Sequence, residues 1–282
     1  MNNDRIQEIL DLMEEARLDY FLISDPQSIA YCTGYYNDPH ERMFVFMISK
    51  HGNHTLFMND LFYLEHDLDV NIVWHKDGQD AIQTIVDEMH FPGRIGIDKN
   101  WASHFLLDLM KKLPDAKYIN ASPCVDLVRM KKDLQEQVLM IESSKINDAV
   151  MEEIIPFIQE GVTEKQLAKK LDELFFNHHS TCYGAIVAFG KNAADPHHEN
   201  DDTPLRKGDC VLIDMGCVYK GYCSDMTRTF FYEGILEEEI KVYEIVKKAN
   251  EAAEAMIKPG VKLSDIDKCA RKVISDEGYG KY

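Results

Sequence analysis

Two aspartates, Asp214 and Asp225, have the residue type and spacing in this sequence that best suit metal chemistry. They lie in two apolar runs within residues 210–231, on either side of a turn that contains Lys220 and Gly221. Apolar runs around such a turn predict a β-hairpin. If the hairpin is centred just before Lys220, the two carboxylates lie directly opposite each other on one face.

Two carboxylates in this position require compensation, because their Cβ atoms would be about 5 Å apart and the charges repel. A divalent cation removes the repulsion, and carboxylate oxygens are suitable ligands for Mn²⁺-like ions. A dinuclear centre needs more donors than these two. The alternative is that both aspartates face solvent, paired with Arg206 or Arg228.

A second polar cluster, Asn192-Ala-Ala-Asp-Pro-His-His-Glu199, lies between the strand expected to end at Phe189 and the hairpin. A loop histidine near a metal can donate to a substrate carbonyl or move a proton. His197 is therefore a candidate catalytic residue. The alternative is that this loop is simply a polar surface.

The elements that position these residues divide the chain in two. Up to residue 122, helices and strands alternate, which predicts an α/β domain with helices over 2–17, 81–89 and 104–112 and strands over 20–23, 43–48, 54–58 and 94–98. Prolines bracket residues 115–122, which we interpret as a connection. We expect one domain over 1–122 and another over 123–282.

The second domain contains a repeated helix-helix-strand pattern. An amphipathic helical segment over 125–158 precedes a helix that begins with a capping box of Thr163 and Gln166. A second pair of helices follows. Its first helix covers 238–257 and its second helix begins near Ser264. The strands of the first copy are expected over 183–189 and 210–232, whereas the second copy has its helices but none of its strands.

Composition narrows the class of protein. The 282 residues carry 49 acidic and 31 basic side chains, a net charge of −18, which disfavours nucleic acid and anionic membranes as partners. The acidity can equally serve solubility alone. Seven cysteines without a CxxC pair indicate reduced thiols. No apolar run is long enough for a membrane span and no signal peptide is evident, so we expect a cytoplasmic protein.

Several stretches together resemble the pita-bread metallopeptidase family, in its Xaa-Pro dipeptidase (prolidase) and aminopeptidase P branch. Order, spacing and residue type all agree in Ile186-Val-Ala-Phe-Gly190, Asn192-Ala-Ala with Pro196-His197, Leu212-Ile-Asp-Met-Gly216 and Gly221-Tyr-Cys-Ser-Asp-Met-Thr-Arg-Thr229. The N-terminal part is similar to the creatinase-type domain of the same branch, through Asp19-Tyr-Phe-Leu-Ile23 and Ile29-Ala-Tyr-Cys-Thr-Gly-Tyr35.

The resemblance implies two divalent metal ions, with Mn²⁺ expected and Co²⁺ or Zn²⁺ as alternatives. It implies that Asp214 chelates one ion, that Asp225 bridges both, and that His197 contacts the substrate. The implied reaction removes an N-terminal residue ahead of proline from proline-containing peptides, by metal-activated water. The resemblance also implies a homodimer.

The sequence departs from this family after the second helix pair. The strands that carry the family's other ligands, one histidine and two glutamates, and its general-base glutamate have no counterpart here. We therefore expect an α/β (α+β) chain with a creatinase-like domain followed by an incomplete pita-bread domain, inactive as given. The alternatives are a non-catalytic module of this fold that binds peptides or proteins, and a creatinase-like hydrolase of amidino compounds.

Overall fold

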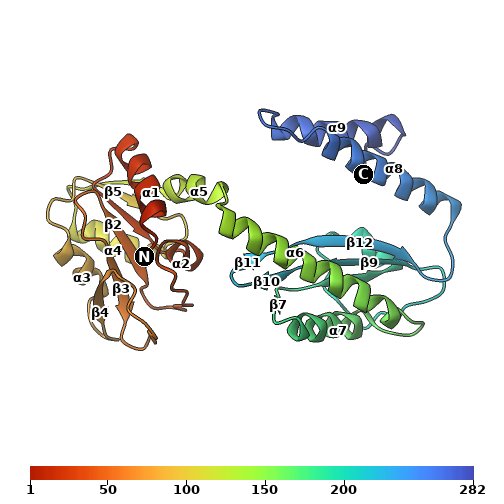
Figure 1. The fold of residues 1–282 in the computed structure, drawn as a ribbon, viewed down its shortest axis with the longest axis horizontal. Coiled ribbons are helices and arrows are strands. Elements are labelled where there is room, and N and C mark those ends of the chain that lie inside the picture. The colour runs from red at the N-terminus through yellow and green to blue at the C-terminus, as the bar shows by residue number, and fades with distance from the viewer. The chain divides into compact units, whose positions relative to one another are not determined.

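The computed structural model describes residues 1–282 in two compact units, Met1–Lys132 and Asp133–Tyr282. Each unit has its own sheet and its own apolar core, built from helices and strands that Figure 1 shows as a ribbon. The predicted α/β class is confirmed. No helix of the chain is both long enough and apolar enough to cross a membrane.

The first unit is a six-stranded mixed sheet in the order β4-β3-β2-β1-β5-β6, with helices packed against both faces. Alternate residues of β1 explain the two layers, because Phe21 and Ile23 join one core cluster whereas Tyr20 and Leu22 join the other. The strands are β1 (Tyr20–Ile23), β2 (Val45–Ser49), β3 (Thr55–Asn59), β4 (Asn71–His75), β5 (Arg94–Ile97) and β6 (Lys117–Asn120). The helices are α1 (Asn3–Glu15), α2 (Pro26–Thr33), α3 (Ala81–Glu88), α4 (Ser103–Lys112) and α5 (Ser122–Met130).

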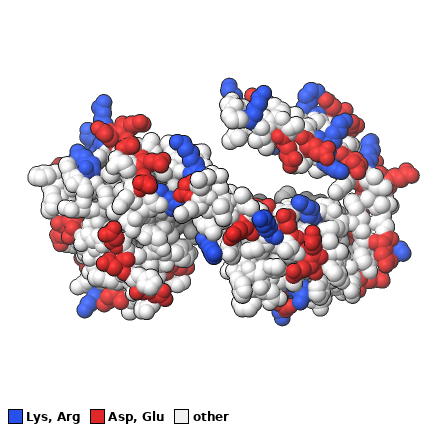
Figure 2. All heavy atoms as spheres, in the orientation of Figure 1, with Lys and Arg blue, Asp and Glu red and all other residues white.

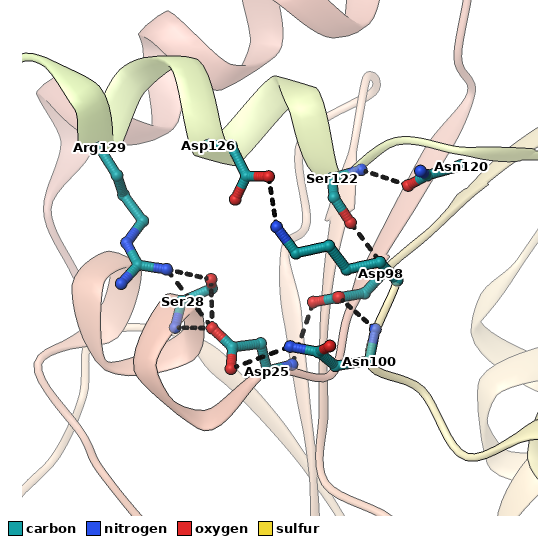
Figure 3. A network of polar contacts seen from close by, with 9 residues as sticks. Asp25, Ser28, Asp98, Asn100, Asn120, Ser122, Asp126 and Arg129 are labelled. Carbon is teal, nitrogen blue, oxygen red and sulfur yellow. Dashed lines mark hydrogen bonds and ion pairs between the residues drawn. The ribbon is translucent and has the colours of Figure 1, made fainter. Parts of the chain in front are cut away.

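The stretch 115–122, interpreted above as a connection, contains β6 and the first residue of α5. A polar network attaches α5 to the first unit (Figure 3). Arg129 donates to the Ser28 hydroxyl at 2.9 Å, and Lys99 Nζ lies 2.5 Å from the Asp126 carboxylate. The buried apolar residues of α5 also belong to the first core. For these reasons the first unit extends through α5, beyond the boundary at residue 122 that the prolines suggest.

The predicted helical segment over 125–158 is divided between the two units. Asp133 starts a new helix, because its carboxylate accepts from Glu136 N–H at 2.9 Å and the Glu136 side chain accepts from Asp133 N–H at 2.9 Å. This capping box begins α6 (Leu134–Ile154), which is followed by a short 3₁₀ turn, η1 (Ile155–Phe157). The charged residues between α5 and α6 therefore separate two helices where the amphipathic pattern suggests one.

In the second unit, α6 and α7 (Glu164–Asn177) cover one face of a sheet with the order β12-β9-β8. The strands are β8 (Ile186–Phe189), β9 (Cys210–Met215) and β12 (Met226–Phe231). Val211, Ile213 and Met215 alternate inward from β9 onto these helices. A smaller sheet continues the hairpin with β7 (Thr181–Cys182), β10 (Cys217–Tyr219) and β11 (Tyr222–Cys223). A 3₁₀ turn, η2 (Gly190–Ala194), follows β8.

The last two helices, α8 (Glu237–Ala255) and α9 (Leu263–Asp276), pack against each other. An edge-to-face contact of Phe231 with Tyr243, with ring centroids 6.0 Å apart, links α8 to β12. On the face drawn in Figure 2, acidic side chains are spread over both units and basic side chains lie among them. The net negative charge is thus distributed over this face and does not form a single acidic patch there.

Candidate active site

The aspartate hairpin forms, but in a different register from the predicted one. Thr227 lies opposite Asp214 in the antiparallel pairing of β9 with β12, so the predicted direct pairing of Asp214 with Asp225 is wrong. Lys220 and Gly221 form a two-residue turn with φ of 48° and 85°. Two consecutive positive φ angles are typical of the tight hairpin turn that matches strand twist. The hairpin is therefore centred one position later than predicted.

Moving the centre by one position shifts the register by two, which leaves the two aspartates on the same face. Asp225 precedes Thr227 by two residues, and Thr227 Oγ1 donates to Asp214 Oδ1 at 2.7 Å. Asp214 is half-buried and Asp225 is exposed, and neither carboxylate forms an ion pair. The arginine pairing considered as an alternative is absent, since Arg228 donates to the Thr227 carbonyl. The carboxylates are diagonal neighbours rather than a facing pair.

Tyr183 lies beside these two aspartates, although nothing in the sequence around it indicates this position. Its hydroxyl donates to the Ser224 carbonyl, at the interruption between the two ladders of the hairpin. Burial raises the pKa of Tyr183 to about 12, and the nearby negative charges of Asp225 and Asp214 add to the rise. Tyr183 therefore lies next to both aspartate strands, because its hydroxyl contacts the carbonyl of Ser224, the neighbour of Asp225, and lies close to Gly216, two residues after Asp214.

Gly216 is the point of closest approach in the hairpin. A Cβ atom at this position would overlap the Tyr183 hydroxyl and the Ser224 carbonyl oxygen. Beyond Gly216 the pairing of the hairpin resumes, where Ser224 N–H donates to the Cys217 carbonyl at 3.0 Å. Only glycine permits the backbone after Asp214 to pass this close to Tyr183.

Helix α6 holds the same stretch of backbone from the core side. Asn147 Nδ2 donates to the Met215 carbonyl at 3.3 Å, and Ser143 Oγ donates to the Cys217 carbonyl at 3.4 Å. Both side chains are buried and lie one helical turn apart. These contacts fix the strand immediately after Asp214, on the side opposite to its carboxylate.

The structure places His197 in the exposed loop after η2 and brings it into contact with neither aspartate. Its backbone N–H donates to Asp195 Oδ1 at 3.0 Å. The neighbouring His198 points inward, where its Nε2 lies 2.6 Å from an oxygen of the buried Glu164. Sequence reasoning did not find this buried histidine–glutamate contact, because Glu164 is distant in the chain and lies at a helix start.

Two groups of side chains have the chemistry of metal ligands. Asp214 and Asp225 offer hard oxygen donors on one face with no competing cation, which fits divalent ions such as Mn²⁺. Glu164, His198 and Asp201 offer ligand atoms that all lie within 4.8 Å of one another. Each oxygen of Glu164 already accepts two hydrogen bonds, so the aspartate pair is the better candidate.

We expect Gly216→Ala to destabilise the second unit by about 1–3 kcal/mol, the usual cost of an overpacked site. The added methyl group must displace either the Tyr183 ring or the Ser224 backbone. Urea unfolding measures the change. In a Tyr183→Ala background the cost should fall, because one of the two obstacles is gone. An unchanged unfolding midpoint in the single variant would contradict the packing described here.

We expect both Asp214→Asn and Asp225→Asn to lower the pKa of Tyr183. Each carboxylate disfavours the negative tyrosinate, so removing its charge makes ionisation easier. An ultraviolet titration, with the curve of Tyr183→Phe subtracted, isolates this hydroxyl. Asp202→Asn, an exposed aspartate that does not act on Tyr183, is the control and should leave the titration unchanged. A Tyr183 pKa that neither site variant moves would show that the carboxylates lie elsewhere.

Comparisons with known proteins agree with this architecture. Residues 138–282 match the model of metallopeptidase family M24, and residues 5–131 match the creatinase/prolidase N-terminal domain. An uncharacterized peptidase of Staphylococcus aureus is 30% identical over 99% of this chain and 80% of its own length. A dipeptidase from Pyrococcus horikoshii is 33% identical with a TM-score of 0.89, over 99% of this chain and 79% of that one.

A second solved structure, an Xaa-Pro dipeptidase from Bacillus anthracis, is 26% identical with a TM-score of 0.89, over 99% of this chain and 79% of that one. The likeness extends through both units and includes the pita-bread arrangement of the second. The predicted resemblance is confirmed: the chain belongs to metallopeptidase family M24 and carries a creatinase/prolidase N-terminal domain.

Proposed function

We propose that this protein is a metal-dependent peptidase that cleaves the bond between an N-terminal residue and proline. One observation carries the proposal: Asp214 and Asp225 share a face of the hairpin without a basic partner, in a member of a metallopeptidase family. Solved relatives named as a dipeptidase and an Xaa-Pro dipeptidase support the peptide substrate.

In this proposal Asp214 and Asp225 would supply two of the ligands for two divalent cations, with Mn²⁺ preferred for carboxylate donors. Bound ions of this kind acidify water and polarise a substrate carbonyl. The protein's own contribution is to keep the carboxylates in place. Thr227 fixes one oxygen of Asp214, and the contact of Asn147 with Met215 fixes the adjoining backbone.

His197 has a separate role in the proposal. Its side chain is exposed on a loop, so it is accessible to a peptide that binds over the hairpin. An imidazole can donate a hydrogen bond to the reacting carbonyl and can pass a proton to the leaving amine near neutral pH. His197 thus handles the proton while the carboxylates hold the ions.

The experiment is hydrolysis of matched dipeptides, Xaa-Pro against Xaa-Ala, with Mn²⁺ and after removal of metal by a chelator. We expect cleavage of the proline peptide that requires metal and is restored when Mn²⁺ is added back, in a protein that combines these residues with the family's further ligands. Residues 1–282 alone are expected to be inactive. Peptide binding without cleavage would favour a non-catalytic module. Cleavage of amidino compounds in place of peptides would favour the creatinase-like alternative.

A further inference from the structure

Glu164 is a charged residue in an unusual position, fully buried in the first turn of α7. Thr163 caps this helix, so the carboxylate lies at the end where the helix dipole favours negative charge. Burial of a carboxylate is unfavourable unless hydrogen bonds replace its water. The identity of those hydrogen bonds therefore shows what the residue holds together.

Four donors satisfy the Glu164 carboxylate. Oε1 accepts from Phe189 N–H at 2.8 Å and from Asn192 Nδ2 at 2.9 Å. Oε2 accepts from His198 Nε2 at 2.6 Å and from Asp201 N–H at 3.1 Å. The first pair lies at the end of β8 and in η2, and the second pair lies after the loop. One carboxylate thus closes the loop at its base.

His197 is carried by the loop between these donors. Its imidazole is exposed and has no hydrogen-bond partner, so its position depends on the backbone that carries it. His198, the next residue, makes the shortest of the four contacts with Glu164. Displacing His198 from Glu164 would therefore move the histidine beside it.

We propose that Glu164 is a positioning residue: through Asn192 and His198 it holds the loop in the conformation that presents His197 to the substrate. The inference rests on the proposed function, because it gives His197 a peptide to contact. It adds a residue whose chain position, far from the hairpin and the histidine loop, gives no indication of such a role. Glu164 itself does not reach the substrate, because it is fully buried.

The same three side chains, Glu164, His198 and Asp201, have the spacing of metal ligands. A metal at this position would have to take over oxygens that already accept four hydrogen bonds. The geometry therefore points to a hydrogen-bonded anchor. Binding of Zn²⁺ that is lost in Glu164→Gln but kept in Asp225→Asn would overturn this assignment.

The first test is amide hydrogen exchange in Glu164→Gln and His198→Gln. A glutamine at 164 turns an NH₂ group toward two donors and leaves them unpaired. We expect exchange over residues 190–200 to rise at least about tenfold, with β9 and β12 unchanged, as expected for local opening. Glu173→Gln, an exposed glutamate on the same helix, is the matched control. An equal rise throughout the second unit would mean general destabilisation and would overturn the proposal.

The second test is a double-mutant cycle with His197→Ala, measured on an Xaa-Pro dipeptide with Mn²⁺ in the same ligand-complete protein as the hydrolysis experiment. Misplacement of a group by about 1 Å can cost about a hundredfold in rate, so we expect Glu164→Gln to lower kcat by up to that factor while KM changes little. The loss should disappear in the His197→Ala background. A loss of equal size in both backgrounds would show that Glu164 acts independently of His197.

The two tests separate failure of the inference from failure of the proposed function. A protein that cleaves no dipeptide but shows the local rise in exchange would refute the proposed function and retain Glu164 as the anchor of the loop. A protein that cleaves Xaa-Pro peptides but shows no local rise in either variant would refute the anchor and retain the function.

Discussion

Asp225→Asn is expected to abolish metal-dependent hydrolysis of Xaa-Pro dipeptides. An amide has the shape of the carboxylate but lacks its charge, so it would not replace the anionic ligand that Asp225 would supply to the cations. Substitution of residues that only support metal ligands already costs about 10–100-fold, so loss of a ligand should cost at least about a hundredfold in kcat/KM. The measurement is the initial rate at saturating Mn²⁺, together with calorimetric titration of the metal.

The control for this variant is Asp202→Asn, an exposed aspartate whose carboxylate pairs with Lys165 at 3.1 Å. It removes the same charge from the second unit without touching the hairpin, and it should leave the rate unchanged. Thr227→Val is a graded companion, because it removes the hydrogen bond to Asp214 Oδ1 but keeps both carboxylates. Normal turnover in Asp225→Asn would remove the basis for assigning Asp225 to the metal.

Elements fixed by local chemistry were predictable from the sequence. The strand Tyr20–Ile23 has the predicted bounds, since four consecutive apolar residues suit a position covered on both faces. The capping box of Thr163 and Gln166 is confirmed by hydrogen bonds of 3.3 and 3.0 Å. Both signals lie within a few residues of the structure they predict.

The edge strand β6 and the register of the hairpin could not be predicted in this way. The short strand β6 is half-exposed at the sheet edge, so its sequence reads as a connection. The hairpin register depends on whether Lys220 adopts positive φ, which is uncommon for a residue other than glycine. A shift of one in the turn centre was enough to replace Asp225 by Thr227 opposite Asp214.

The two aspartates nevertheless share one face of the hairpin. Side chains along a strand alternate between the two faces with a period of two residues, and the register moved by two. What the sequence could not indicate are the supports of the site. Tyr183, Asn147 and Glu164 contact the hairpin or the histidine loop across large separations in the chain. Residue types with metal chemistry are visible in a sequence, whereas the residues that hold them in place need the fold.

The second large effect is expected in the core of the second unit, from Phe175→Ala. Phe175 on α7 is fully buried in the cluster that includes Leu171 and Ile213. Truncation of a buried phenylalanine costs about 3–5 kcal/mol, because transfer free energy is lost and a cavity remains. We expect this loss in urea unfolding of the second unit, with faster amide exchange in β9 and β12.

The matched variant is Phe57→Ala, which removes an equally buried ring from the first unit. Because each unit has its own core, each variant should raise exchange mainly among the buried amides of its own unit. Phe175→Ala should also weaken Mn²⁺ binding, since Ile213 packs in the same cluster directly before Asp214. Equal destabilisation of both units by either variant would contradict the separate cores, whereas unchanged metal binding would show that the hairpin holds its carboxylates without support from α7.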